Sequence, residues 1–192
     1  APEFNLPAVH KEGRISLADY RGRSPVLLAI FRGLYCPFCR RALAQFGTVQ
    51  DKLLQAGVES LAVVATDLDN ARLYFKYRPA RVPIVADPDL ITHRAYGLPQ
   101  PPMNEQTMQA IEGLRINPTG ELPEPMMPMA AAAALDRIHG YEQTATDKRD
   151  FERQGVLLKG QFLLDSAGIV RWANIECGNE GLPGFGKFPT ED

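Results

Sequence analysis

The sequence predicts an α/β fold in which a central mixed β-sheet is flanked by helices. Three observations predict it: a continuous apolar run at 26–31, strand and helix patterns that alternate over 26–86, and two apolar strands within 161–173. With 192 residues, 45% of them hydrophobic, the chain is expected to form one soluble domain over 1–192.

Each element in the first half has its own signal. Gly13 is placed to turn the chain between two short apolar stretches, which predicts an N-terminal β-hairpin within 5–20. The run at 26–31 is typical of a central strand buried on both faces. A helix is expected over 36–56, because apolar residues recur near helical period and stop at Gly57. The elements expected next are a strand at 59–65, a helix at 69–77 and a strand at 82–86.

The second half is less regular. Prolines interrupt residues 98–154, so we expect a loop-rich Pro/Met-rich insertion that contains one short helix at about 129–139. Its Met and Leu content makes it a candidate lid or homodimer contact. A closing antiparallel hairpin is expected at 161–173, with Gly168 in the turn, and an irregular tail follows.

Composition excludes several classes of partner. With 21 Lys+Arg against 23 Asp+Glu, the net charge is −2, which gives no basis for a nucleic-acid partner. The longest apolar runs, 26–31 and 129–135, are far shorter than the roughly 20 residues of a membrane span, so no membrane partner is expected. Three cysteines are too few for a disulfide scaffold, and no targeting segment is evident, which favours a cytoplasmic location.

Cys36 and Cys39 form a Cys-x-x-Cys pair where a buried strand meets a helix. The helix dipole and free N–H groups favour a thiolate there, so the pKa of Cys36 is expected to fall. Cys39, three residues on, can form a disulfide with it. No Asp or Glu lies between Asp19 and Asp51, and that segment carries five cations: Arg21, Arg23, Arg32, Arg40 and Arg41.

Other interpretations of these residues stay open. The two cysteines can be inert buried thiols, and Arg40 and Arg41 can be a solvated helix face. A zinc or copper site would use Cys36, Cys39 and Cys177 with one histidine, although no second ligand pair has the usual spacing. Cys177 is a possible extra thiol, although such a cysteine more often takes no part in the chemistry. The candidate histidines for such a site are His10, His93 and His139, and the candidate ligands for soft copper are Met126, Met127 and Met129.

Three motifs occur in order along the chain: Phe31-Arg32-Gly33-Leu34-Tyr35-Cys36-Pro37-Phe38-Cys39-Arg40-Arg41, then Pro83-Ile84-Val85-Ala86-Asp87-Pro88, then Phe162-Leu163-Leu164-Asp165. Over 1–97 and 160–173 the sequence resembles the peroxiredoxin-like AhpC/TSA branch of the thioredoxin superfamily. This resemblance implies a thioredoxin-like fold and a thiol redox enzyme without a cofactor.

The resemblance implies that Cys36 attacks a hydroperoxide and Cys39 resolves the product to a disulfide, which an external thiol reductant of the thioredoxin or glutathione type reduces. Arg32, with Lys159 or Arg40, would stabilise the leaving oxygen. The motif residues that support the cysteines are Tyr35, Pro37 and Phe38.

The sequence departs from the peroxiredoxin pattern. Gly33 and Ala29 stand where typical members carry Thr and Pro before the reactive Cys, and Lys159 stands where they carry Arg. The alternative is therefore a thioredoxin-like disulfide oxidoreductase that uses the same two cysteines. A copper- or zinc-binding module is the third hypothesis.

Overall fold

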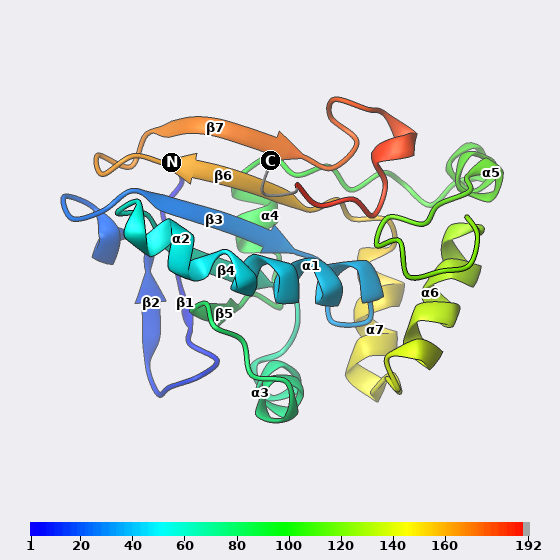
Figure 1. Cartoon of the computed structure of the whole chain (residues 1–192), viewed down its shortest axis with the longest axis horizontal. Coiled ribbons are helices and arrows are strands. Elements are labelled where there is room, and N and C mark those ends of the chain that lie inside the picture. The colour runs from blue at the N-terminus through cyan, green and yellow to red at the C-terminus, as the bar shows by residue number, and fades with distance from the viewer. Residues whose placement is uncertain (190–192) are drawn as a thin grey trace.

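A computed structural model describes residues 1–189 and contains a mixed five-stranded sheet with strand order β5-β4-β3-β6-β7. The strands are β3 (Val26–Phe31), β4 (Glu59–Val64), β5 (Ile84–Ala86), β6 (Gly160–Leu164) and β7 (Val170–Ile175). β3 runs parallel to β4 and antiparallel to β6, and β4 runs parallel to β5. The predicted mixed sheet and the central position of β3 are confirmed (Figure 1).

Both faces of the sheet are covered, which explains the continuous apolar run of β3. Ala29 and Phe31 pack into a core that includes the apolar side of α1 (Pro37–Thr48). Leu28 and Ile30, on the opposite face, pack into a second core with the N-terminal hairpin. That hairpin pairs β1 (Asn5–Pro7) with β2 (Arg14–Ser16), as the sequence predicted, and a short 3-10 helix follows at Leu17–Tyr20.

The helix expected over 36–56 is in fact two helices. α1 ends at Thr48 and α2 (Gln50–Gln55) begins after Val49, which has φ −90° and ψ −3°. The Thr48 hydroxyl bonds to the carbonyl of Gln45, so the side chain competes with the helical ladder at the break. Apolar spacing continues through the break, and for that reason periodicity alone did not reveal it.

The remaining helices of the first half are α3 (Leu68–Tyr77), which was predicted, and α4 (Ile91–Ala95), which was not. The insertion is more helical than expected. It contains α5 (Glu105–Gly113), α6 (Pro128–Ile138) and α7 (Ala145–Gln154), of which only α6 was predicted. These three helices gather at one end of the sheet, beside the start of α1 (Figure 1). A 3-10 turn at Leu182–Gly184 follows β7.

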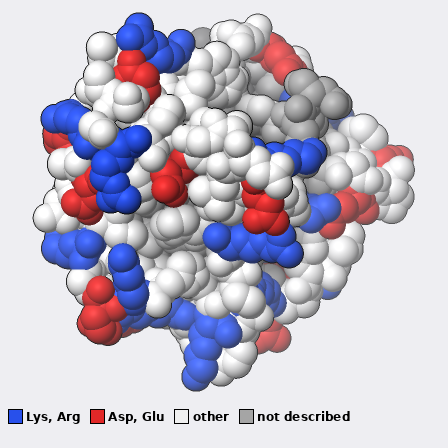
Figure 2. Space-filling model, turned by 60° about the vertical axis from the view of Figure 1, so that its left-hand side comes forward, with Lys and Arg blue, Asp and Glu red and all other residues white. Residues whose placement is uncertain are grey.

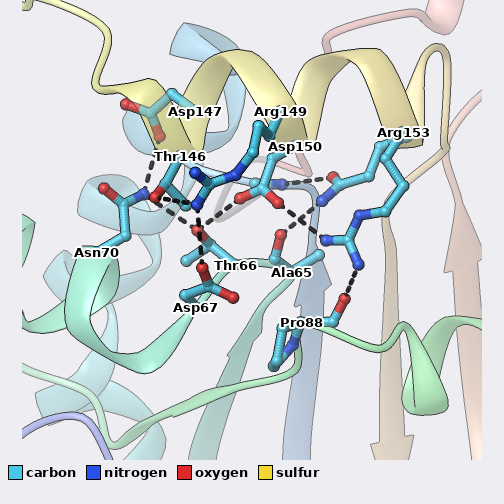
Figure 3. Close-up of polar contacts among 12 residues, drawn as sticks. Ala65, Thr66, Asp67, Asn70, Pro88, Thr146, Asp147, Arg149, Asp150 and Arg153 are labelled. Atoms are coloured by element: carbon cyan, nitrogen blue, oxygen red, sulfur yellow. Dashed lines mark hydrogen bonds and ion pairs between the residues drawn. The ribbon is translucent and has the colours of Figure 1, made fainter.

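Polar contacts fasten α7 to the ends of β4 and α3 (Figure 3). The Thr66 hydroxyl donates to an Asp150 carboxylate oxygen at 2.6 Å, and the Asn70 amide donates to Asp147 at 2.9 Å. Arg153 forms an ion pair with Asp150 at 2.8 Å and also donates to a backbone carbonyl in the turn after β5. Because these carboxylates are buried and fully partnered, α7 is held in one position.

The surface is mixed in charge. On the face drawn in Figure 2, Lys and Arg side chains lie among Asp and Glu side chains without a large area of one sign. No helix within residues 1–189 is long and apolar enough to cross a membrane.

Candidate active site

Cys36 and Cys39 lie at the junction of β3 and α1. Cys36 is the N-cap residue of α1: its Sγ accepts the backbone N–H of Cys39 at 3.4 Å, and Pro37 occupies the first helical position. A proline there loses no helical hydrogen bond. Both thiols are free and buried, with 5% of Cys36 and 2% of Cys39 exposed.

A buried ion cluster lies behind the cysteines. Arg32, directly after β3, donates its Nε–H to Cys39 Sγ at 3.4 Å, and its Nη2 donates to both carboxylate oxygens of Glu176 at 2.7 and 2.8 Å. Lys159 Nζ lies 3.1 Å from the same carboxylate, which also accepts the backbone N–H of Gly186 at 2.7 Å. The ion-pair side chains are at most 3% exposed, so water screens them little.

The cluster and the pairing of the two thiols set their ionisation. Burial opposes a charge on Cys39, but a hydrogen bond from Cys36 and the charges of Arg32 and Lys159 lower the pKa of Cys39 to about 5. Burial, together with the hydrogen bond to Cys39, raises the pKa of Cys36 well above normal. The reduced pair therefore holds one thiolate, mainly on Cys39. The expected fall in the pKa of Cys36 is wrong for the reduced protein, because burial of the thiol and its hydrogen bond to Cys39 outweigh the lowering by Arg32.

A cavity of about 470 Å³ opens in front of Cys36. Cys36 and Arg32 are among its lining residues, and Cys39 is not, within the described part of the chain. The insertion supplies the apolar wall: Met108, Ile111, Met129, Ala132 and Phe151. A small ligand in the cavity can therefore contact Cys36, whereas Cys39 lies behind Cys36 and outside the cavity wall.

The loop before Cys36 is fixed by the insertion and by close packing. The Gly33 N–H donates to the Gln154 side chain at 2.9 Å, and the Gln154 amide donates to the Ala65 carbonyl at 2.6 Å. A Cβ on Gly33 would lie 2.9 Å from the Tyr35 ring and 3.1 Å from the Ala65 carbonyl oxygen. Tyr35 packs edge-on against Phe151 of α7. Gln154 at the end of α7 thus links the insertion to the cysteine loop.

Arg40 does not join the sulfurs. Its guanidinium donates to the Leu34 carbonyl at 2.6 Å, forms an ion pair with Asp136 of α6 and stacks on the Tyr141 ring at 3.7 Å. Arg40 therefore ties the cysteine loop to the insertion, and Lys159 is the second cation of the site. Pro37 and Phe38 line the cavity, and Phe38 contacts Phe185 edge-on.

Cys177 directly follows Glu176, is half-buried and has a left-handed backbone with φ 64°. Burial and the nearby carboxylate raise the pKa of Cys177 to about 11, so its thiol is protonated at neutral pH. Within residues 1–189, no group of three or more His, Cys, Asp or Glu side chains is arranged to hold a metal ion. This does not favour the proposed zinc or copper site.

Sequence reasoning missed Glu176, Gln154 and Phe185. Phe185 places its ring 4.9 Å from the Arg32 guanidinium carbon, and it comes from the Gly-rich tail that was expected to be irregular. Glu176 lies 144 residues from Arg32 along the chain, and no local pattern marks it. The one available signal was the charged Glu176, three residues after the expected end of the closing hairpin at 173.

Comparisons with known proteins identify a family and several structures of similar fold. The AhpC/TSA family model matches residues 1–173. No curated protein matches the sequence. One similar structure is a Plasmodium vivax 2-Cys peroxiredoxin in its reduced form, with 14% identity over 91% of this chain and 82% of that chain and a TM-score of 0.56.

Two further structures have comparable similarity. A bacterioferritin comigratory protein of Xanthomonas campestris, described with alkyl peroxide reduction activity, has 13% identity over 90% of this chain and 80% of that chain, with a TM-score of 0.55. A putative thiol:disulfide interchange protein DsbE of Chlorobium tepidum has 20% identity over 91% of this chain and 81% of that chain, with a TM-score of 0.53. At these identities the structures show a shared thioredoxin-like fold.

The family match covers most of the chain and includes the strand, loop and helix that carry the cysteine pair. The chain therefore belongs to the AhpC/TSA family and is a thiol-dependent redox enzyme, a peroxidase or a thiol–disulfide oxidoreductase.

Proposed function

We propose that this enzyme is a thiol peroxidase that reduces organic hydroperoxides through Cys36, with Cys39 as the resolving cysteine. The observation that carries the proposal is the apolar cavity that Cys36 lines and that Cys39 does not line. An alkyl hydroperoxide combines an apolar body with one reactive O–O bond, and both parts fit a cavity with Met, Ile and Phe side chains and one reactive sulfur.

The chemistry starts with a proton transfer. Cys36 donates its S–H to the Cys39 thiolate, so moving that proton leaves a Cys36 thiolate at the cavity. This thiolate attacks the terminal peroxide oxygen: an S–O bond forms, the O–O bond breaks and the alkoxide leaves. Arg32, which also lines the cavity, stabilises the developing negative charge.

Resolution uses the second sulfur. The alkoxide takes the proton held by Cys39 and leaves as the alcohol, which restores the Cys39 thiolate. That thiolate attacks the Cys36 sulfenic acid, the S–S bond forms, and hydroxide leaves and is protonated by solvent. An external thiol of the thioredoxin or glutathione type then reduces the disulfide. One peroxide thus consumes two thiol equivalents, which closes the cycle.

A disulfide oxidoreductase is the second candidate. The Cys-x-x-Cys spacing and the N-cap position of Cys36 favour it, because that arrangement suits thiol–disulfide exchange. Burial argues against a protein disulfide as the main substrate. With only 5% of Cys36 exposed, a folded partner's disulfide can reach the sulfur only after the insertion moves, whereas a small hydroperoxide can enter the cavity.

The test is a competition between oxidants. Reduced protein with Cys177→Ser is mixed with one equivalent of cumene hydroperoxide, hydrogen peroxide or oxidised glutathione. The reaction is quenched at times from milliseconds to minutes, and the intact mass of the protein is measured by mass spectrometry. The proposal expects loss of two hydrogens through disulfide formation fastest with cumene hydroperoxide. Faster oxidation by oxidised glutathione than by either peroxide would refute the proposal and favour the second candidate.

A further inference from the structure

The ion cluster behind the cysteines holds an unequal number of charges. Glu176 accepts both Arg32 and Lys159, so a single carboxylate faces two cations. All three side chains are almost fully buried. An unbalanced charge in such a place is costly, and a thiolate on the adjacent cysteine pair supplies the missing negative charge.

Other titratable groups near the cluster do not change this balance at neutral pH. Burial raises the pKa of Tyr35 well above normal and that of Cys177 to about 11, so both stay protonated. Burial lowers the pKa of His93 to about 4, so its ring is neutral. Asp150, the carboxylate of α7 on this side, is paired with Arg153 at 2.8 Å. The buried Asp87 carboxylate, near His93, accepts its hydrogen bonds from Ile91 and Thr92 and has no contact with the cluster among the described contacts.

Geometry divides the two cations by role. One Arg32 nitrogen, Nη2, donates to both carboxylate oxygens of Glu176, and the Arg32 Nε–H donates to Cys39 Sγ, so Arg32 connects the carboxylate to the sulfur. Lys159 Nζ lies 3.1 Å from the same carboxylate, and one carboxylate balances only one of the two cations, so the presence of Lys159 leaves the cluster with a net positive charge. We propose that Lys159 is a positioning residue that supplies the net positive charge stabilising the thiolate. Glu176 limits that net charge, because its carboxylate neutralises one of the two cations.

This proposal concerns ionisation of the thiols and applies whichever oxidant the site uses. It predicts that the thiolate pKa of each variant follows the net charge of the cluster. Lys159→Met leaves a neutral Arg32–Glu176 pair, Glu176→Gln leaves two unbalanced cations, and the double variant leaves Arg32 alone with the same net charge as the natural cluster. Lys159→Arg keeps the charge and is the matched control.

The experiment measures the thiolate directly and needs no substrate. In a Cys177→Ser background, the reduced variants are titrated by thiolate ultraviolet absorbance and by the pH dependence of iodoacetamide alkylation, with circular dichroism to verify folding. Lys159→Met is expected to raise the apparent thiolate pKa by about 1–2 units, as loss of a nearby cation does. The double variant is expected to return toward the natural value, and Lys159→Arg to stay near it.

Two results would overturn the proposal. One is a Lys159→Met protein with an unchanged thiolate pKa, which would make Arg32 the only counter-charge. The other is a double variant that titrates like Lys159→Met, which would show that Glu176 does not offset Arg32. If Glu176→Gln alone does not fold, Lys159→Met and the double variant still decide the matter. A failure of the proposed peroxidase activity would leave this titration unaffected.

Discussion

Gln154 offers a direct test of how the insertion holds the cysteine loop. The side chain is 1% exposed and bridges the Gly33 N–H and the Ala65 carbonyl, at 2.9 and 2.6 Å. Gln154→Met keeps the length and removes both polar partners. Two buried backbone groups are then left unpaired, and each costs about 1–3 kcal/mol, so we expect the free energy of unfolding to fall by about 2–6 kcal/mol.

Urea denaturation of the reduced protein measures this loss, and the melting temperature should drop by roughly 5–15 °C for a chain of this size. The matched control is Gln109→Met on α5, an exposed glutamine whose side chain bonds only to Glu105 at 3.3 Å among the described contacts. That control should stay within about 0.5 kcal/mol of the natural protein. A Gln154→Met protein as stable as the control would refute the bridging role of Gln154.

Two further predictions concern Gly33 in the cysteine loop and the ionisation of Cys36 and Cys39. Gly33→Ala should destabilise the protein by about 1–3 kcal/mol in urea denaturation, because the Ala65 backbone at 3.1 Å cannot yield, whereas Gly113→Ala, with open space around the new methyl group, should be neutral or stabilising. The reduced protein should gain stability over its Cys36→Ser/Cys39→Ser variant as pH rises from about 5 towards 8.5. In that window the folded pair has released a proton that the unfolded thiols still hold. Unfolding free energies that stay parallel across this range would contradict the lowered pKa.

Much of the architecture follows from apolar periodicity. β3 and the Val-rich β4 were predicted because a strand buried on both faces is a nearly continuous apolar run. The hairpin of β6 and β7 was predicted from its apolar strands and the Gly168 turn, although β7 itself is largely exposed. α5 and α7 were missed because their apolar stripes are weak. Each nevertheless carries a cap signal, Asn104 before α5 and the Thr144–Asp147 capping box before α7.

The residues of the site also differ in whether the sequence could predict them. Cys36, Cys39 and Arg32 are close in sequence, so strand and helix geometry alone brings them together. Lys159 came from the family resemblance rather than from a local pattern. Glu176 and Gln154 reach the site only through the folded sheet and the position of α7, and a single sequence does not encode such distant contacts in any local pattern.

In the proposed mechanism, Cys36 reacts with the peroxide and Cys39 resolves the resulting sulfenic acid. The most direct measurement compares Cys36→Ser with Cys39→Ser, both carrying Cys177→Ser, after one equivalent of cumene hydroperoxide and trapping with dimedone. We expect Cys39→Ser to form a sulfenic acid on Cys36 within seconds, because Cys36 lines the cavity that the peroxide enters, and Cys36→Ser to react far more slowly, because Cys39 does not line it. Faster oxidation of Cys39 in the Cys36→Ser protein would contradict this assignment and reverse the two roles.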